Sequence, residues 1–464
     1  MQRRARGGVL VIGGGFGGAS VARLLGERGA TIVSVENSML FTPMLPEVAA
    51  GIIEMRHVVM PLAIVCPHAE LIVGRLRGLD LEGCRAEIET DGGLDLCVEY
   101  EHVVVAVGAV PRTFPIPGLL EHGVGCATAL DGLYLRNQML RLLAAAAVDD
   151  DPERRRRNLT FVFVGGGFAG VETLAELREL AQDALHHHRS LRDVPQRWVL
   201  VDAAPRILAE IPSRLGQYAA DLLVERGVEL HLDTRLESVE DGRVTLSDGT
   251  VLDAGLLVWT TGVKANPLVS RLGLPLDDRG RVRVGPTLQV VGYENVWALG
   301  DCAGVPNTAT PDHVDPPTSQ HALRQARRLT ANLVALRQGR PPRPYGFRAL
   351  GQVATLGRRK GIADIRGVRL SGLAGWCAAR GVHLVQVPGV SRRMRVLSDW
   401  ILSLLFRSDI VTFGGLVQAP PIVAPHQGSL VATPTLWDGA NDPKRDSWSV
   451  TDAGARALPY PDRP

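Results

Sequence analysis

The first hydrophobic run of the chain, residues 9–12, leads directly into a cluster of glycines. Helix-compatible sequence with one apolar face follows at residues 19–27, and Gly29 ends it. A second strand-like run then ends on an acidic residue, Glu36. This succession of strand, glycine turn, helix and strand predicts a unit that binds a dinucleotide.

Three glycines of this turn stand at the G-x-G-x-x-G spacing. Gly13 permits the tight turn, Gly15 lets a pyrophosphate approach the backbone, and Gly18 lets the helix pack close to the strand. The phosphates would lie at a helix N-terminus, where free N–H groups and the helix dipole favour anions. Glu36 is placed to accept hydrogen bonds from ribose hydroxyls. The alternative is a merely glycine-rich turn, but the strand, the helix and the acid all agree with a nucleotide site.

The same pattern returns at residues 160–172, in the segment TFVFVGGGFAGVE. Gly165, Gly167 and Gly170 repeat the spacing of the first turn, and a later strand ends in Asp202. The chain therefore contains two copies of one nucleotide-binding design. Because the second copy keeps every glycine, we expect two different nucleotides.

Both copies continue in the same way beyond the acid. Strands are predicted within residues 69–107 and 227–246, with turns at Asp91-Gly92-Gly93 and Asp248-Gly249. Each copy closes on a returning strand and a turn of small residues, VVVAVGAVPR in the first and LLVWTTGVKANP in the second.

Three other segments carry signals that invite a functional interpretation. A helix is predicted at residues 127–148, and the charged run DDDPERRRRN after it is interpreted as a solvated connecting loop rather than an anion site. The triplet His186-His187-His188 is interpreted as solvated surface, because three adjacent helical histidines cannot face one metal. A strand at 296–299 delivers Asp301 at its carboxyl end, where ligands collect in α/β sheets, although Asp301 taken alone better fits an ordinary turn.

The last third of the chain differs from the rest. Residues 341–370 are strand-like, and residues 391–407 have helical apolar spacing flanked by arginines. Such a helix lies either in a membrane interface or against its own core or a twin subunit. Residues 419–464 contain many prolines and little periodicity, so we expect a disordered tail.

The amino-acid composition and net charge exclude some classes of function for this protein. The chain has 464 residues with 45% hydrophobic residues and a net charge of only +2, so a nucleic-acid partner has no electrostatic support. The 6 cysteines are scattered with no CxxC pair, which predicts reduced thiols in a cytosolic protein and no metal site. No signal peptide and no stretch long enough to span a bilayer is recognisable.

These motifs resemble those of the two-dinucleotide-binding flavoproteins and, within that superfamily, of the type II NADH dehydrogenases. The matching segments within residues 8–415 are FTPMLPEVAAG, VGGGFAGVETLAEL, WTTGV, WALGDCA, PPTSQHALRQA and the amphipathic C-terminal stretch. The resemblance implies an α/β fold of two Rossmann-like dinucleotide-binding domains, the second inserted in the first, plus a C-terminal membrane-associating region. The implied domains are an FAD-binding domain at 1–125 and 264–338, an NADH-binding domain at 155–263, and a membrane-associating region at 339–418.

The resemblance also assigns residues to the cofactors. Glu172 would lie near the nicotinamide, and the acid Asp202 predicts NADH over NADPH, a preference that Arg206 would weaken. The FAD-binding residues implied are Gly13, Gly15, Phe16, Gly17, Gly18, Glu36, Gly108 and Asp301. The NADH-binding residues implied are Gly165, Gly167, Ala169, Gly170, Asp202 and Gly262.

The implied reaction passes a hydride from NADH to FAD and then two electrons to a membrane quinone without proton pumping. The quinone motif of the family falls on Gln320 and Gln325, where Ser319 and Arg324 depart from the usual residues. The expected protein is a peripheral respiratory-chain enzyme on the cytoplasmic face of the cell membrane, and a homodimer is considered. The alternatives are a sulfide:quinone-type enzyme, for which Cys302 is the candidate nucleophile, and a flavin-bearing redox sensor.

Overall fold

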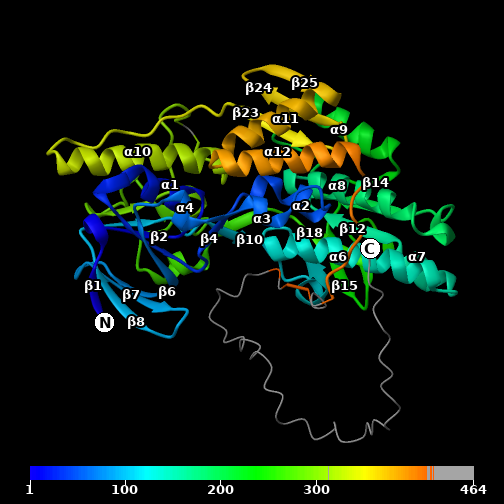
Figure 1. Cartoon of the computed structure of the whole chain (residues 1–464), viewed down its shortest axis with the longest axis horizontal. Helices are drawn as coiled ribbons and strands as arrows, with labels where there is room; N and C mark the ends of the chain where they lie inside the picture. The colour runs from blue at the N-terminus through cyan, green and yellow to red at the C-terminus, as the bar shows by residue number, and fades with distance from the viewer. Residues whose placement is uncertain (312, 415–418, 421, 423–464) are drawn as a thin grey trace, which may run out of the picture. The chain divides into compact units, whose positions relative to one another are not determined.

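The first sheet is built around the hydrophobic run that opens the chain. In this computed structural model, β2 (Val9–Ile12) is buried along its whole length between parallel neighbours on both sides. Strands buried on both faces read as unbroken apolar runs, which is why no alternation is visible in the sequence. The sheet has the order β1 (Gln2–Arg4), β8 (Asp95–Glu99), β7 (Arg85–Thr90), β6 (Glu70–Asp80), β3 (Thr31–Ser34), β2, β9 (His102–Val105) and β21 (Val296–Ala298) (Figure 1).

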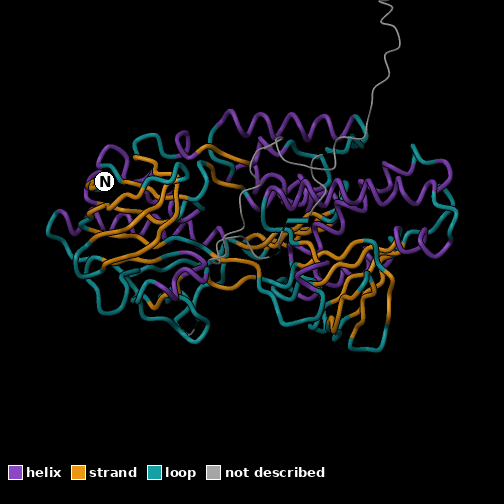
Figure 2. Tube along the Cα trace, turned by 90° about the horizontal axis from the view of Figure 1, so that it is seen from below, coloured by secondary structure: helices purple, strands orange, loops and turns teal. Residues whose placement is uncertain are grey.

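The second sheet repeats the parallel part of the first. Its order is β11 (Gly123–Val124), β18 (Leu256–Trp259), β12 (Thr160–Val164), β13 (Arg197–Val201) and β14 (Val228–His231). The central strand β12 corresponds to β2, and the returning strand β18 corresponds to β9. Figure 2 shows the strands gathered in two separate groups, as the duplication in the sequence predicts.

Antiparallel strands follow the nucleotide units of both copies. In the first copy β6, β7 and β8 form a meander, and the predicted turn at residues 91–93 joins β7 to β8. In the second copy the meander is β15 (Leu236–Glu240), β16 (Arg243–Leu246) and β17 (Val251–Asp253). The predicted turn at Asp248-Gly249 lies between β16 and β17.

The two sheets are joined by a pair of adjacent connections. The chain leaves the first sheet through β10 (Ala109–Pro111) and returns through β19 (Val263–Ala265), and these two strands pair antiparallel. The backbone N–H of Arg112 also donates to the carbonyl oxygen of Gly262 at 2.9 Å. The second dinucleotide fold is therefore inserted in the first, as expected from the order of the motifs.

Helices cover the sheets with their apolar faces. α1 (Phe16–Leu25) packs against α10 (Ser319–Arg337) beside the first sheet. On the second sheet, Phe161 and Phe163 of β12 face the helices α6 (Ala129–Val148), α8 (Phe168–Leu185) and α9 (Ser213–Glu225). The alternate residues Val162 and Val164 face the meander. The helix predicted at 127–148 is confirmed, and the helix predicted at 19–27 begins earlier, at Phe16.

Within the charged run at residues 149–158, residues 152–158 are helical, so the prediction of a connecting loop was wrong for most of the run. α7 (Pro152–Asn158) begins with a proline in its first turn, and the side chain of Asp151 accepts the backbone N–H of Glu153 at 2.9 Å. The cap stabilises this helix, and so does the order of its charges, with the acidic residue in the first turn and arginines in the last turn. The helix therefore forms although most of its residues are charged. Its side chains remain solvated, as expected.

Shorter elements complete the fold. They are β4 (Ser38–Leu40), α2 (Leu45–Ala49), α3 (Met55–Val58), β5 (Val59–Pro61), α4 (Leu62–Val65), α5 (Leu119–His122), β20 (Val282–Arg283) and β22 (Ala303–Gly304). Phe41, next to these elements, makes an edge contact with Phe16 at 5.6 Å between ring centroids. The FTPMLPEV segment therefore lies beside the first glycine turn.

The C-terminal part folds as a small sheet followed by two helices. The sheet comprises β23 (Gly351–Thr355), β24 (Gly361–Ile365) and β25 (Val368–Ser371), and α11 (Gly372–Gln386) packs on it. α12 (Val390–Leu405), predicted from its apolar spacing, buries Val396 and Trp400 against the protein. Within the residues that the structure describes, 1–311, 313–414, 419, 420 and 422, none of the helices has the length and hydrophobicity needed to cross a bilayer. The predicted tail falls almost wholly outside this range.

Candidate dinucleotide sites and a buried carboxyl cluster

The first glycine turn is shaped by close backbone approaches. Gly13 follows β2 with a φ of 112°, and a side chain there would overlap the carbonyl oxygen of Ala106 at the end of β9. A side chain on Gly18 would overlap the carbonyl oxygen of Gly13. By contrast, the space around Gly15 is open, so the backbone there is free to approach a ligand.

The second glycine turn reproduces this geometry residue by residue. Gly165 has a φ of 116°, and a side chain there would overlap the carbonyl oxygen of Thr260 at the end of β18. A side chain on Gly170 would overlap the carbonyl oxygen of Gly165, while Gly167 again faces open space. The two motifs therefore form two cradles with the same steric requirements.

Both helices that leave these turns lack a side-chain cap. α1 and α8 begin after Gly15 and Gly167, and neither glycine offers a side chain to the N–H groups of the first turn. The helices α6 and α10 are capped, since Thr128 accepts from the first turn of α6 and Thr318 from that of α10, whereas α9, α11 and α12 also begin without a side-chain cap. The open N–H groups, the dipole and the uncrowded backbone fit a pyrophosphate at each cradle.

The acid of the second copy is joined to its glycine turn. The carboxylate of Asp202 accepts the backbone N–H groups of Gly166 and, at 2.7 Å, of Ala204. Arg206 points its guanidinium to backbone carbonyl oxygens, that of Ile211 at 3.0 Å and that of Ala209. Glu36, the acid of the first copy, is exposed at the edge of its cradle.

A further acid lies beside the first cradle. Gly300 and Asp301 follow β21, and Gly17 of the turn faces Leu299 at the end of that strand. Burial raises the pKa of Asp301 to about 6. Gly108 and Gly262 stand after the two returning strands with φ of 69° and 93°. Asp301 is thus brought to the carboxyl ends of the first sheet, where ligands bind in such folds.

The two glutamines of the predicted quinone motif hold the backbone in place. Gln320 accepts the N–H of Leu350 at 2.7 Å and donates to the carbonyl oxygen of Gly351 at 3.3 Å. Gln325 is buried, accepts the N–H of Gly300 at 2.8 Å and donates to Asp315 at 2.9 Å. Gln325 therefore positions the loop that carries Asp301. Contact of either glutamine with a quinone stays a prediction.

Glu172 is buried rather than open to a cleft. Its carboxyl accepts the backbone N–H of Thr355, at the end of β23, at 2.8 Å. Burial raises the pKa of Glu172 to about 8, so this carboxyl holds a proton at neutral pH. Its predicted place near a nicotinamide is not tested by these contacts.

A cluster of buried charged residues surrounds Glu172, and the sequence analysis did not single it out. Glu47 of α2 forms an ion pair with Arg380 of α11 at 2.8 Å, and Trp400 of α12 donates to Glu47 at 3.2 Å. Glu176 lies one helical turn beyond Glu172 on α8. An i,i+4 pair of acids on an otherwise apolar helix face was the signal in the sequence that could have identified it.

Cys302, the nucleophile that sulfide chemistry would require, is sealed in the core. Its thiol donates to the carbonyl oxygen of Leu299 at 3.3 Å, and burial raises its pKa to about 11. A thiol that stays protonated and inaccessible is a poor nucleophile. The structure therefore disfavours the sulfide-oxidising alternative.

Comparison with known proteins agrees with the two cradles. The family model for pyridine nucleotide-disulphide oxidoreductases matches residues 7–326. The chain is 31% identical to a type II NADH:quinone oxidoreductase of Mycobacterium tuberculosis, over 86% of this chain and 88% of that protein. It is 28% identical to a demethylphylloquinone reductase of Synechocystis, over 86% and 96% of the two chains. A structure of NDH2 from Plasmodium falciparum in complex with NADH superimposes with a TM-score of 0.81, covering 87% of this chain and 99% of that one at 16% identity.

Duplicated dinucleotide cradles on an inserted pair of parallel sheets define a two-dinucleotide flavoprotein of the pyridine nucleotide-disulphide oxidoreductase class. Within that class, the chain belongs to the type II NADH:quinone oxidoreductase family. It is an FAD-dependent oxidoreductase that uses NADH.

Proposed function

We propose that this enzyme transfers a hydride from NADH to FAD and then passes two electrons to a membrane quinone, without pumping protons. The duplicated cradle is the observation that carries this proposal, since each copy offers one open pyrophosphate site. When bound, FAD supplies the chemistry that accepts a hydride and releases electrons. We assign FAD to residues 1–125 and 264–338 and NADH to residues 155–263.

The protein's own residues bind and orient the two dinucleotides. The first glycine turn and Asp301 hold FAD, and the second turn with Asp202 holds NADH. Asp202 favours NADH because its negative charge repels a 2′-phosphate. Arg206 does not offset this preference, because its guanidinium already donates hydrogen bonds to backbone carbonyl oxygens.

Stopped-flow mixing tests this assignment directly. We expect NADH to bleach the flavin absorbance of the purified protein, and a short-chain ubiquinone analogue to restore it. NADPH should bleach it more slowly at equal concentration. A flavin that NADH reduces but no quinone reoxidises would instead favour a redox sensor, and bleaching by sulfide alone would favour the sulfide-oxidising alternative.

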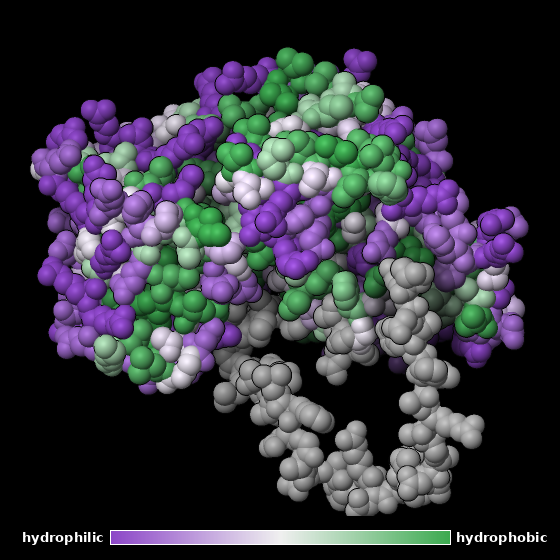
Figure 3. Space-filling model, viewed as in Figure 1, coloured by the Kyte–Doolittle hydropathy of each residue, from purple (hydrophilic) through white to green (hydrophobic). Residues whose placement is uncertain are grey.

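We also propose that the outer face of α12 rests on the membrane. Its inner face packs on the protein, whereas the apolar side chains of Met394, Ile401, Leu402, Leu404 and Leu405 are exposed. Figure 3 shows hydrophobic side chains gathered over this region. Arg395 and Arg407 are exposed near them and suit anionic headgroups. The proposed location is the cytoplasmic face of the cell membrane.

Charge placed on this face should release the protein from lipid. Leu402 and Leu405 are 53% and 71% exposed, so Leu402→Glu with Leu405→Glu should leave the fold intact. The loss of apolar contact should weaken binding to phosphatidylglycerol-containing vesicles by about 3 kcal/mol, or roughly a hundredfold. Co-sedimentation measures this, while NADH-dependent flavin reduction should not change.

Val148→Glu provides the matched control, because Val148 is 81% exposed at the end of α6, away from α12. It should bind vesicles like the unchanged protein. If α12 instead pairs two copies of the chain, the double variant would convert a dimer to a monomer in ultracentrifugation and leave vesicle binding unchanged. That result would contradict the membrane proposal.

A further inference from the structure

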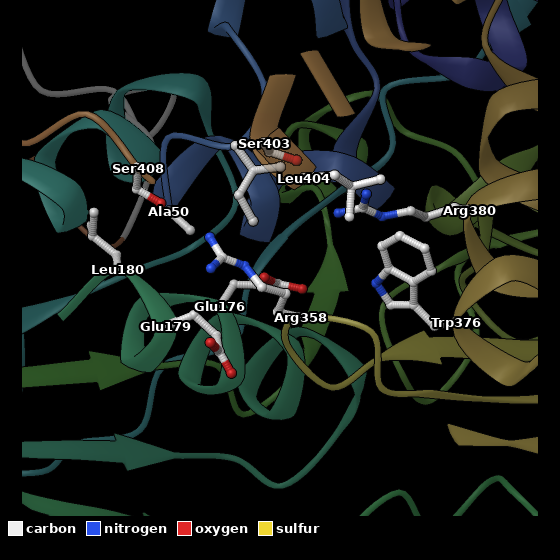
Figure 4. A pocket seen from close by; sticks show the side chains of 11 residues that line it. Ala50, Glu176, Glu179, Leu180, Arg358, Trp376, Arg380, Ser403, Leu404 and Ser408 are labelled. Atoms are coloured by element: carbon white, nitrogen blue, oxygen red, sulfur yellow. The ribbon is translucent and has the colours of Figure 1, made fainter. Parts of the chain in front are cut away.

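A small cavity lies where α8, α11 and α12 meet, and no residue of either glycine turn lines it. Its volume is about 20 Å³, which is room for one water molecule or one monatomic ion. Glu176 of α8 and Trp376 and Arg380 of α11 contribute polar groups to its wall. Figure 4 shows these three side chains pointing toward one another across the cavity.

Four buried polar atoms on these three side chains have no hydrogen-bond partner among the described residues. They are Oε1 of Glu176, Nε1 of Trp376, and Nε and Nη1 of Arg380. Glu176, Arg380 and Trp376 are only 1%, 7% and 8% exposed, so bulk solvent does not satisfy these atoms. Because buried polar atoms are almost always hydrogen-bonded in folded proteins, four unpaired atoms around one cavity indicate a ligand that pairs with them.

All four atoms are able to donate a hydrogen bond at neutral pH. Indole and guanidinium nitrogens are donors only. Burial raises the pKa of Glu176 to about 8, so its carboxyl holds a proton, and Oε1 is the oxygen without a partner. A water molecule has two lone pairs and brings two hydrogens of its own, for which none of these atoms is an acceptor. A monatomic anion accepts from every direction and therefore matches the donors better than water does.

The charges around the cavity are compatible with an anion. Two cations line it, Arg358 and Arg380, against one ionised acid, Glu179. The nearby acids are neutralised in three ion pairs: Glu47–Arg380 at 2.8 Å, Asp183–Arg358 at 3.1 Å and Glu179–Arg226 at 3.3 Å. Burial raises the pKa of Glu172 to about 8 and lowers that of His383 to about 4, so both side chains are neutral at pH 7. The residues that α12 contributes to the cavity wall are uncharged.

We propose that this cavity binds one monatomic anion of the halide class, which is chloride in the cell, and that Arg380, Trp376 and Glu176 hold it by donating hydrogen bonds. The anion links α11 to α8. α12 forms a further wall of the cavity through Ser403 and Leu404, so anion binding stabilises the packing of all three helices. This site is independent of the electron acceptor that the enzyme uses.

Bromide locates the site directly, because it scatters X-rays anomalously and resembles chloride. Crystals of the full chain soaked in sodium bromide should show an anomalous peak in the cavity, within hydrogen-bond distance of Nε1 of Trp376 and of a guanidinium nitrogen of Arg380. Rubidium should give no peak there. Bromide confined to the protein surface, which would be an adventitious ion only, or rubidium in the cavity would overturn the proposal.

Thermal unfolding measures the affinity in solution. Chloride should raise the unfolding midpoint of the wild type in a saturable way, compared with gluconate, a larger anion, at equal ionic strength. Trp376→Phe keeps an aromatic ring next to the guanidinium of Arg380, which lies 4.1 Å from the ring centroid, but removes one N–H donor. Chloride binding should therefore weaken about tenfold or more.

Ser403→Ala is the matched control. Ser403 lines the same cavity, but its hydroxyl donates to the carbonyl oxygen of Trp400 at 2.8 Å, so the chloride affinity should not change. Equal effects of chloride and gluconate on the wild type would contradict the proposal, and so would an unchanged chloride affinity in Trp376→Phe. If Trp376→Phe does not fold, the bromide peak in the wild type decides the question.

The pH dependence of chloride binding tests the part played by Glu176. Above about pH 8 its carboxyl loses the proton, stops donating and repels an anion, so the wild-type affinity should fall about tenfold between about pH 7 and pH 9. Glu176→Gln keeps an N–H donor and does not ionise, so its affinity should be the same at both pH values. A wild type with no pH dependence, or a Glu176→Gln variant without chloride binding at pH 7, would overturn this donor set.

Discussion

Gly18→Val should yield a protein that is colourless, and Gly170→Val a protein that is yellow but that NADH no longer bleaches. In each cradle the last glycine packs against the carbonyl oxygen of the first, so a side chain there must push the helix off the strand. The displaced N–H groups can no longer hold a pyrophosphate. Because the cradles have the same geometry but belong to different sheets, each substitution should remove one dinucleotide only.

Absorbance of the purified variants measures the flavin content, and stopped-flow bleaching measures NADH binding. Gly381→Ala in α11 is the control, since nothing lies near the added methyl group and alanine favours a helix. It should be yellow and fully active. Loss of flavin from Gly170→Val with retention of flavin in Gly18→Val would reverse the assignment of the two cradles.

Arg380→Met should destabilise the C-terminal helices by about 3–5 kcal/mol. The substitution leaves Glu47 buried without its cation, and burial already raises the pKa of that carboxyl. It also removes the guanidinium that lies over the rings of Trp376 and Trp400. Denaturant unfolding followed by tryptophan fluorescence reports on this contact directly, because both rings lie in it.

The double variant Glu47→Gln with Arg380→Met is the decisive control. It removes both charges, so most of the stability should return. A single variant that unfolds within about 0.5 kcal/mol of the wild type would show that the ion pair is not what joins α11 to α2. A double variant no more stable than Arg380→Met would assign the loss to the ring contacts instead.

The glycine spacing made both cradles predictable from sequence. Gly13, Gly18, Gly165 and Gly170 are required by local backbone approaches, and those requirements leave the same pattern in any chain that folds this way. The amphipathic helix at α12 was predictable for a similar reason, because apolar spacing is a local property. The error at α7 has a local cause as well, since Asp151 and Pro152 cap a run whose charge suggested a loop.

The carboxyl cluster was not predictable, because it is assembled from segments far apart in the chain. Glu47, Glu176, Thr355 and Arg380 come from four different elements, and only packing brings them together. Nothing in the sequence indicated that Gln325 faces inward and accepts the backbone N–H of Gly300. Nor did it indicate that the guanidinium of Arg206 donates to backbone carbonyl oxygens. Such facts depend on side-chain direction and on partners supplied by other elements.

The sequence by itself determined that two dinucleotides are bound and by which turns, since a pyrophosphate cradle is a local structure whose sterics select glycine. Only the tertiary structure decided which acids lose water and keep their protons, because desolvation is imposed by everything packed around a side chain.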